Sequence, residues 1–91
     1  MKFEFKKPYV FEGKEYKEIE VDIDALTGDD MSAAKKEYAA DGNFTLIPAT
    51  DWDFCILVAA RATQQPLEFF KRMPAKEYCK LATGVSNFLL A

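Results

Sequence analysis

The sequence contains no histidine, only two cysteines, and few glycines or prolines. Without histidine, the most common general base of enzymes and the usual activator of a nucleophilic serine or cysteine are missing. The isolated glycines form neither a G-x-G-x-x-G sequence nor a phosphate-binding loop. Two thiols without an imidazole make a poor zinc site. The sequence therefore predicts a protein that is not an enzyme and holds no cofactor or metal.

The two cysteines are too few for the disulfide framework of a small secreted domain. Cys55 lies in an apolar stretch, where burial raises the pKa of a thiol and makes it a poor nucleophile. We expect Cys55 and Cys79 to be buried groups that pack as small apolar side chains.

Long apolar segments are also missing. The longest run, residues 54–60, is far shorter than the roughly 20 residues that cross a bilayer. The alternating charges at the N-terminus are unlike the apolar centre of a signal peptide. The net charge of −3 and the interleaving of basic with acidic residues argue against binding to nucleic acid. We expect a soluble, intracellular protein without a membrane or nucleic-acid partner.

The 91 residues suit one domain of the α+β class, namely an N-terminal antiparallel β-hairpin packed on three to four helices. We assign residues 1–23 to the hairpin and residues 27–91 to the helical part. Apolar residues alternate with charged ones in two runs on either side of Gly13, which suits the positive φ of a tight turn. Pro8 interrupts the first run and predicts an edge strand or a bulge. The alternating apolar residues are Phe3, Phe5, Tyr9 and Phe11, followed by Ile19, Val21 and Ile23.

Three features delimit the first helix and the loop that follows. Thr27 is the predicted N-cap, with acidic residues in the first turn, and Gly42 suits the position after the helix end. The apolar stripe of this helix is thin, so we expect it at the periphery. In the loop 43–49, we expect the large apolar side chains to turn inward. The stripe contains Met31, Ala34 and Tyr38, and the loop contains Phe44, Leu46 and Ile47.

Two longer helices should build most of the core. Residues 52–63, with Thr50 as the predicted N-cap, are apolar on nearly every side, which is typical of a central helix. A short helix at 67–72 follows, and Pro74 opens the last helix. Gly84 within that helix suggests close packing against another backbone. The last helix has an amphipathic stripe formed by Tyr78, Leu81, Ala82, Val85, Phe88 and Leu89.

Neighbouring carboxylates could be read as a metal or acid–base pair, namely Asp22 with Asp24 and Asp29 with Asp30. Their places at a strand end and at a helix start favour a structural role instead.

Three surfaces could bind a partner. Phe69 and Phe70 are adjacent in a short helix, so we expect one in the core and leave the other open. The apolar C-terminus, Phe88, Leu89 and Leu90, either docks on the domain or receives another chain. The edge of the hairpin can accept a strand from a partner.

The order of these elements resembles the tail assembly chaperones of Mu-like and other long-tailed phages and prophages. The likeness is carried by residues 3–21, by Asp24 to Met31 at the entry to the first helix, and by the apolar segment 54–62. It closes with the Met73–Pro74 step and the sequence Asn87-Phe88-Leu89-Leu90. Together these motifs cover nearly the whole chain.

The resemblance implies a protein that binds the tape-measure protein, and also tail-tube subunits, during tail assembly. It would act in the cytoplasm of the bacterial host and be absent from the mature virion. The resemblance implies no catalytic residues. Self-association, and the existence of a frameshifted longer form, are left open.

Two other classes remain as alternatives. One is a small acidic regulator, encoded by a phage or prophage, that inhibits a single host protein. The other is a permanent component of the tail or of the head–tail junction.

Overall fold

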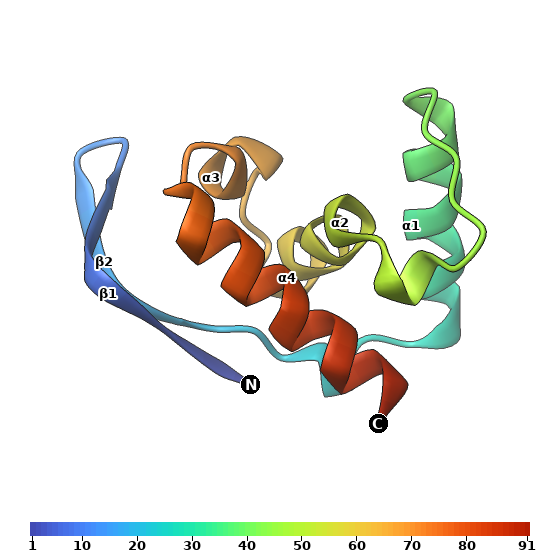
Figure 1. Ribbon diagram of the computed structural model, residues 1–91, viewed down its shortest axis with the longest axis horizontal. Coiled ribbons are helices and arrows are strands. Elements are labelled where there is room, and N and C mark those ends of the chain that lie inside the picture. The colour runs from blue at the N-terminus through green and yellow to red at the C-terminus, as the bar shows by residue number, and fades with distance from the viewer.

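The computed structural model describes residues 1–91 and has the predicted order of elements, a two-stranded antiparallel hairpin followed by helices (Figure 1). The elements are β1 (Lys2–Phe11), β2 (Lys14–Glu20), the 3-10 turn η1 (Ile23–Ala25), α1 (Gly28–Ala40), the 3-10 turn η2 (Pro48–Thr50), α2 (Trp52–Thr63), α3 (Leu67–Lys71) and α4 (Ala75–Leu90). The predicted α+β class is confirmed. None of the helices is long and apolar enough to span a membrane.

The hairpin turns at Glu12 and Gly13, whose φ angles of 51° and 79° are both positive. Positive φ at both central residues is the geometry that matches the twist of two-residue hairpins. The predicted bulge is also present. Glu4 pairs with Glu18 and Tyr9 with Tyr16, so four residues of β1, including Pro8, face one residue of β2.

The second strand ends at Glu20, earlier than the apolar alternation predicted. Val21 exchanges backbone hydrogen bonds with Met1, both of 2.7 Å. The backbone pairing of the hairpin ends with this pair. Ile23 therefore enters the turn η1, where its side chain remains buried.

The hairpin packs on the helices through Phe69 of α3. The Phe69 ring meets the rings of Tyr9, Phe11 and Tyr16 edge-on, with centroid distances of 5.2, 5.2 and 4.9 Å. The Tyr9 hydroxyl also donates a hydrogen bond of 2.6 Å to the Phe69 carbonyl. An isolated two-stranded hairpin is marginally stable in water, so this contact supplies the apolar surface that it needs.

The central helix is α2, as predicted. Every residue from Phe54 to Ala60 is buried, and α2 contacts α1, α3 and α4. Trp52 and Asp53 in its first turn are exposed, Trp52 to 48%. The hairpin and α1 lie at opposite ends of the long axis (Figure 1), so α1 is peripheral as expected and buries only Ala34 fully.

The last helix carries the predicted stripe. Leu81, Ala82 and Val85 are buried, and Phe88 and Leu89 pack against the core. Pro74 precedes the helix as its N-cap rather than starting it. The prediction that Gly84 packs against another backbone is wrong. A Cβ at Gly84 would lie 2.9 Å from the Met1 side chain and would meet no backbone.

We predict that Phe69→Ala lowers the free energy of unfolding by about 3–5 kcal/mol, because it empties the contact between hairpin and helices. Phe44→Ala, at a side chain that is exposed, is the matched control and should change it by less than about 0.5 kcal/mol. Urea denaturation followed by circular dichroism measures both variants. Similar losses from the two substitutions would contradict the assignment of Phe69 as the central contact.

Candidate functional site

The structure separates the five residues that the sequence predicted for partner binding. Phe69 and Phe70 are both 0% exposed, so the expected core position holds for one and the position left open for the other is also in the core. Adjacent side chains on a helix point in different directions, but α3 lies between the hairpin and α2, and both directions lead into the core. Phe88 and Leu89 are partly buried against the core, and Leu90 is 60% exposed. A partner can therefore reach Leu90 most readily.

A larger apolar surface lies in the loop between α1 and η2. Phe44, Leu46 and Ile47 are 84%, 85% and 60% exposed, which contradicts the expectation that they turn inward. The ring that packs edge-on against Phe54 of α2 is that of Tyr38, with the centroids 5.7 Å apart. We call these three residues together with Trp52 the apolar surface. The only indication of this surface in the sequence is that three large apolar residues lie in a segment without helical or strand periodicity.

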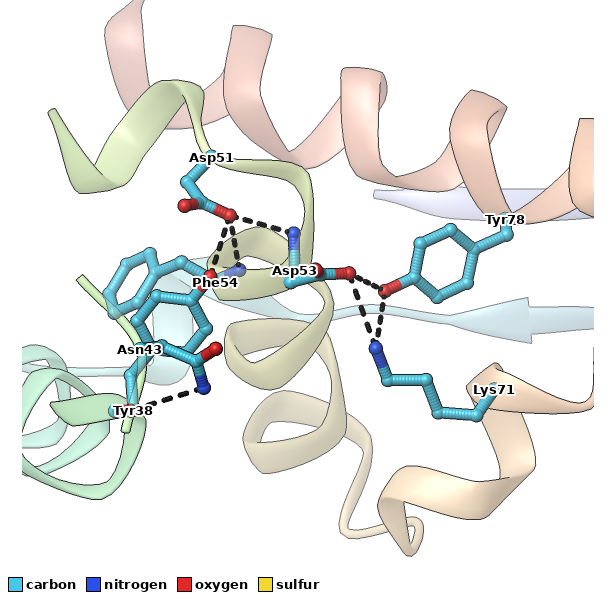
Figure 2. A network of polar contacts seen from close by, with 7 residues as sticks. All are labelled: Tyr38, Asn43, Asp51, Asp53, Phe54, Lys71 and Tyr78. Atoms are coloured by element: carbon cyan, nitrogen blue, oxygen red, sulfur yellow. Dashed lines mark hydrogen bonds and ion pairs between the residues drawn. The ribbon is translucent and has the colours of Figure 1, made fainter. Parts of the chain in front are cut away.

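The C-terminal end of this loop is held by Asp51 (Figure 2). One Asp51 carboxylate oxygen accepts hydrogen bonds from the Tyr38 hydroxyl at 2.9 Å and from the backbone N–H groups of Asp53 and Phe54 at 3.0 and 3.3 Å. Asp51 is thus the N-cap of α2, and the prediction of Thr50 is wrong because Thr50 ends η2 and bonds back to Ile47.

Burial, and then the bond to the Asp51 carboxylate, raise the pKa of Tyr38 to about 12. The Tyr38 hydroxyl therefore remains a neutral donor at physiological pH. The bond joins α1 directly to the start of α2 and fixes the two ends of the intervening loop relative to each other.

Two further contacts fix the backbone around the apolar surface. The Ser86 hydroxyl of α4 donates a 2.6 Å hydrogen bond to the Ala49 carbonyl. The Asn43 side-chain amide donates one of 3.2 Å to the Tyr38 carbonyl (Figure 2). The loop is therefore held on both sides of its exposed apolar residues. Leu90 lies one helical turn beyond Ser86, on the same side of α4.

The thiol of Cys55 belongs to the same framework and donates to the Ala49 carbonyl at 3.4 Å. Burial raises the pKa of Cys55 to about 11, so the thiol stays protonated and is a weak nucleophile. Cys55 is buried as expected, whereas Cys79 is only partly buried.

A second polar cluster joins α2, α3 and α4 (Figure 2). Lys71 donates to Asp53 at 3.2 Å and to the Tyr78 oxygen at 3.0 Å, while the Tyr78 hydroxyl donates to Asp53. The bond from Tyr78, assisted by Lys71, lowers the pKa of Asp53. A carboxylate with a lowered pKa is a weak base, so this cluster is better suited to hold the helices together than to transfer protons.

The carboxylate pairs of the sequence have structural surroundings. Asp30 forms a capping box with Thr27, in which the Thr27 backbone N–H donates to Asp30 at 2.8 Å. Asp30 also lies 3.7 Å from Arg61. Asp22 and Asp24 are exposed at the turn η1, and Asp29 is exposed in the first turn of α1.

We predict that the Asp53 cluster stabilises the fold less in acid. The pKa of Asp53 is lower in the folded chain than its ordinary value of 3.8, so its contribution is present above that value and is lost as the pH falls through the lowered one. Asp53→Asn should therefore reduce stability at pH 6, and its difference from the unsubstituted chain should shrink below about pH 4. Thermal unfolding from pH 6 to pH 3 measures this. Asp24→Asn, outside the cluster, is the control, and a constant difference for Asp53→Asn would contradict the linkage.

Comparison with known proteins assigns this chain to a family. The family model described as "Phage tail assembly chaperone proteins, E, or 41 or 14" matches residues 2–90. Searches of curated proteins and of solved structures found no match. Because the family match covers nearly the whole sequence, this chain belongs to the phage tail assembly chaperones, the family that its order of elements resembles.

Proposed function

We propose that this tail assembly chaperone binds apolar segments of the tape-measure protein through its apolar surface, and that it also contacts tail-tube subunits. The single observation that carries the proposal is the exposure of Phe44, Leu46 and Ile47 on one short loop. Clustered exposed apolar side chains usually mark an interaction site. Family membership gives the role in tail assembly.

The framework around the loop supports this use of the surface. The bonds of Tyr38 to Asp51 and of Ser86 to Ala49 hold the backbone while the apolar side chains point away from the core. A surface that is held in this way loses little conformational freedom on binding, which favours association. Leu90, at the adjacent end of α4, extends the area that a partner could cover.

The size of the surface favours weak, reversible binding by each copy. Complete burial of its three loop side chains, Phe44, Leu46 and Ile47, contributes roughly 5–9 kcal/mol. Loss of translational and rotational freedom costs about 4–15 kcal/mol, so little net affinity remains for a single site. Several copies along one long partner would gain by multivalency, and each could still dissociate when the tail assembles.

The proposed action is non-catalytic and takes place in the cytoplasm of the bacterial host, with the chaperone absent from the mature virion. The polar clusters of the chain support the first point, since Asp51 caps a helix, Asp53 is paired with Lys71 and Tyr78, and Cys55 is a protonated thiol.

We predict that co-expression of the chain with the tape-measure protein of the same phage increases the soluble fraction of that protein and allows both to be purified together. The double variant Phe44→Asp, Leu46→Asp should lose both effects while keeping its circular dichroism spectrum, because both side chains are exposed. Leu90→Asp should weaken the effects and also spare the fold.

The control is Val10→Asp, which matches Leu90→Asp in charge and lies at a side chain that is 61% exposed on the hairpin. This variant should solubilise the tape-measure protein as well as the unsubstituted chain does. If Phe44→Asp, Leu46→Asp solubilised the tape-measure protein as well as the unsubstituted chain, the apolar surface would be excluded as the binding site. Retention of one host protein from a lysate, with no effect on the tape-measure protein, would instead support the regulator alternative.

A further inference from the structure

A basic seam lies between β1 and α4, in a chain that is acidic as a whole. Two neighbouring hollows, of about 500 and 460 Å³, follow the seam. Five lysines and two glutamates line them, although the whole chain has 12 basic and 15 acidic residues. The lysines are Lys2, Lys6, Lys7, Lys76 and Lys80.

The residues that line the seam show that it follows the edge of β1. Side chains of a strand alternate between its two faces, so a hollow on one face is lined by every second residue. Here residues 1–4 line one hollow and residues 5–9 the other, without gaps. β2 covers only one edge of β1 in this two-stranded sheet. The seam therefore runs beside the edge of β1 that carries no partner strand.

The bulge concentrates positive charge at the larger hollow. Because β1 loses its alternation there, Lys6, Lys7 and Pro8 are exposed in succession. Lys6, Lys7 and Lys76 form no ion pair, whereas Lys2 and Lys71 do. The rings of Phe5 and Tyr9, 5.4 Å apart, supply an apolar floor.

We propose that this seam binds an acidic segment of a partner protein, in extended conformation, as a third strand beside β1. Apart from Pro8, which has no N–H, the free edge offers backbone N–H and C=O groups, and the unpaired ammonium groups of Lys6, Lys7 and Lys76 receive the carboxylates of alternate residues. The seam is separate from the apolar surface and does not depend on the function proposed for it.

Two other occupants are disfavoured by the same observations. A nucleic acid offers phosphates but no backbone that continues a sheet, and the acidic remainder of the chain would repel it. A second copy that paired its own β1 edge with this one would bring the two sets of lysines together, and like charges on neighbouring strands are destabilising.

The test uses a fluorescein-labelled heptapeptide, Thr-Glu-Val-Glu-Val-Glu-Thr, with the Gln-for-Glu peptide as the neutral control. We expect the acidic peptide to bind the full-length chain in fluorescence anisotropy, more weakly as salt increases, and the neutral peptide to bind at least about tenfold more weakly. Lys6→Glu, Lys7→Glu should weaken binding of the acidic peptide by at least about tenfold.

Lys35→Glu, Lys36→Glu is the matched control, since it changes the charge by the same amount at adjacent exposed lysines of α1. It should bind the peptide within about threefold of the unsubstituted chain, because exposed charges beyond a Debye length are screened. Equal losses in both double variants would mean a non-specific charge effect and would overturn the proposal. Binding of an oligothymidylate in preference to the peptide, or self-association that Lys6→Glu, Lys7→Glu abolishes, would also overturn it.

Strand addition has its own readout. N-methylation of alternate residues of the peptide removes N–H donors from one edge at a time, so one of the two methylated isomers should lose binding and the other should retain it. Equal binding of both isomers would exclude a third strand. The variant Phe44→Asp, Leu46→Asp should bind the peptide normally, so failure of the function proposed for the apolar surface leaves this result unaffected.

Discussion

The insertion of Phe69 beneath the aromatic face of the hairpin is the contact on which the remaining arrangement depends. Two strands alone cannot exclude water from both faces, so the hairpin requires a surface to cover its aromatic rings. Phe69 provides it through edge-on ring contacts and through the hydrogen bond that its carbonyl accepts from Tyr9. With the hairpin held on α3, β1 lies beside α4, and this position creates the basic seam.

The two surfaces of the chaperone differ in chemistry and are built from different elements. The seam borders α4 from Pro74 to Asn87, on the side of β1, whereas the loop of the apolar surface leads into η2, where the Ala49 carbonyl is bonded to Ser86 of α4. Both surfaces rest on parts of the chain that interrupt regular structure, namely the β1 bulge and the loop after α1. Irregular backbone leaves side chains unpaired with neighbours, which is why such segments often carry binding function.

The candidate site was only partly predictable from the sequence. The apolar C-terminus directed attention to Leu90, which is exposed, but also to Phe88 and Leu89, which pack on the core. The loop residues Phe44 and Leu46 were expected inside because burial is the usual state of large apolar side chains. In the structure Tyr38 packs against Phe54 while Phe44 and Leu46 stay exposed, and no pattern in the sequence indicates that arrangement.

The sequence by itself determined the features that rest on local rules. These are the turn at Gly13, the cap at Thr27, the burial of every residue from Phe54 to Ala60 and the stripe of α4, because each follows from the backbone preference or periodicity of neighbouring residues. Only the tertiary structure decided that the hairpin pairing ends at Met1 and Val21, that Phe69 and Phe70 are both enclosed, and that the lysines of β1 and α4 share one seam. Those features depend on residues far apart in the chain, whose approach is set by the packing of whole elements.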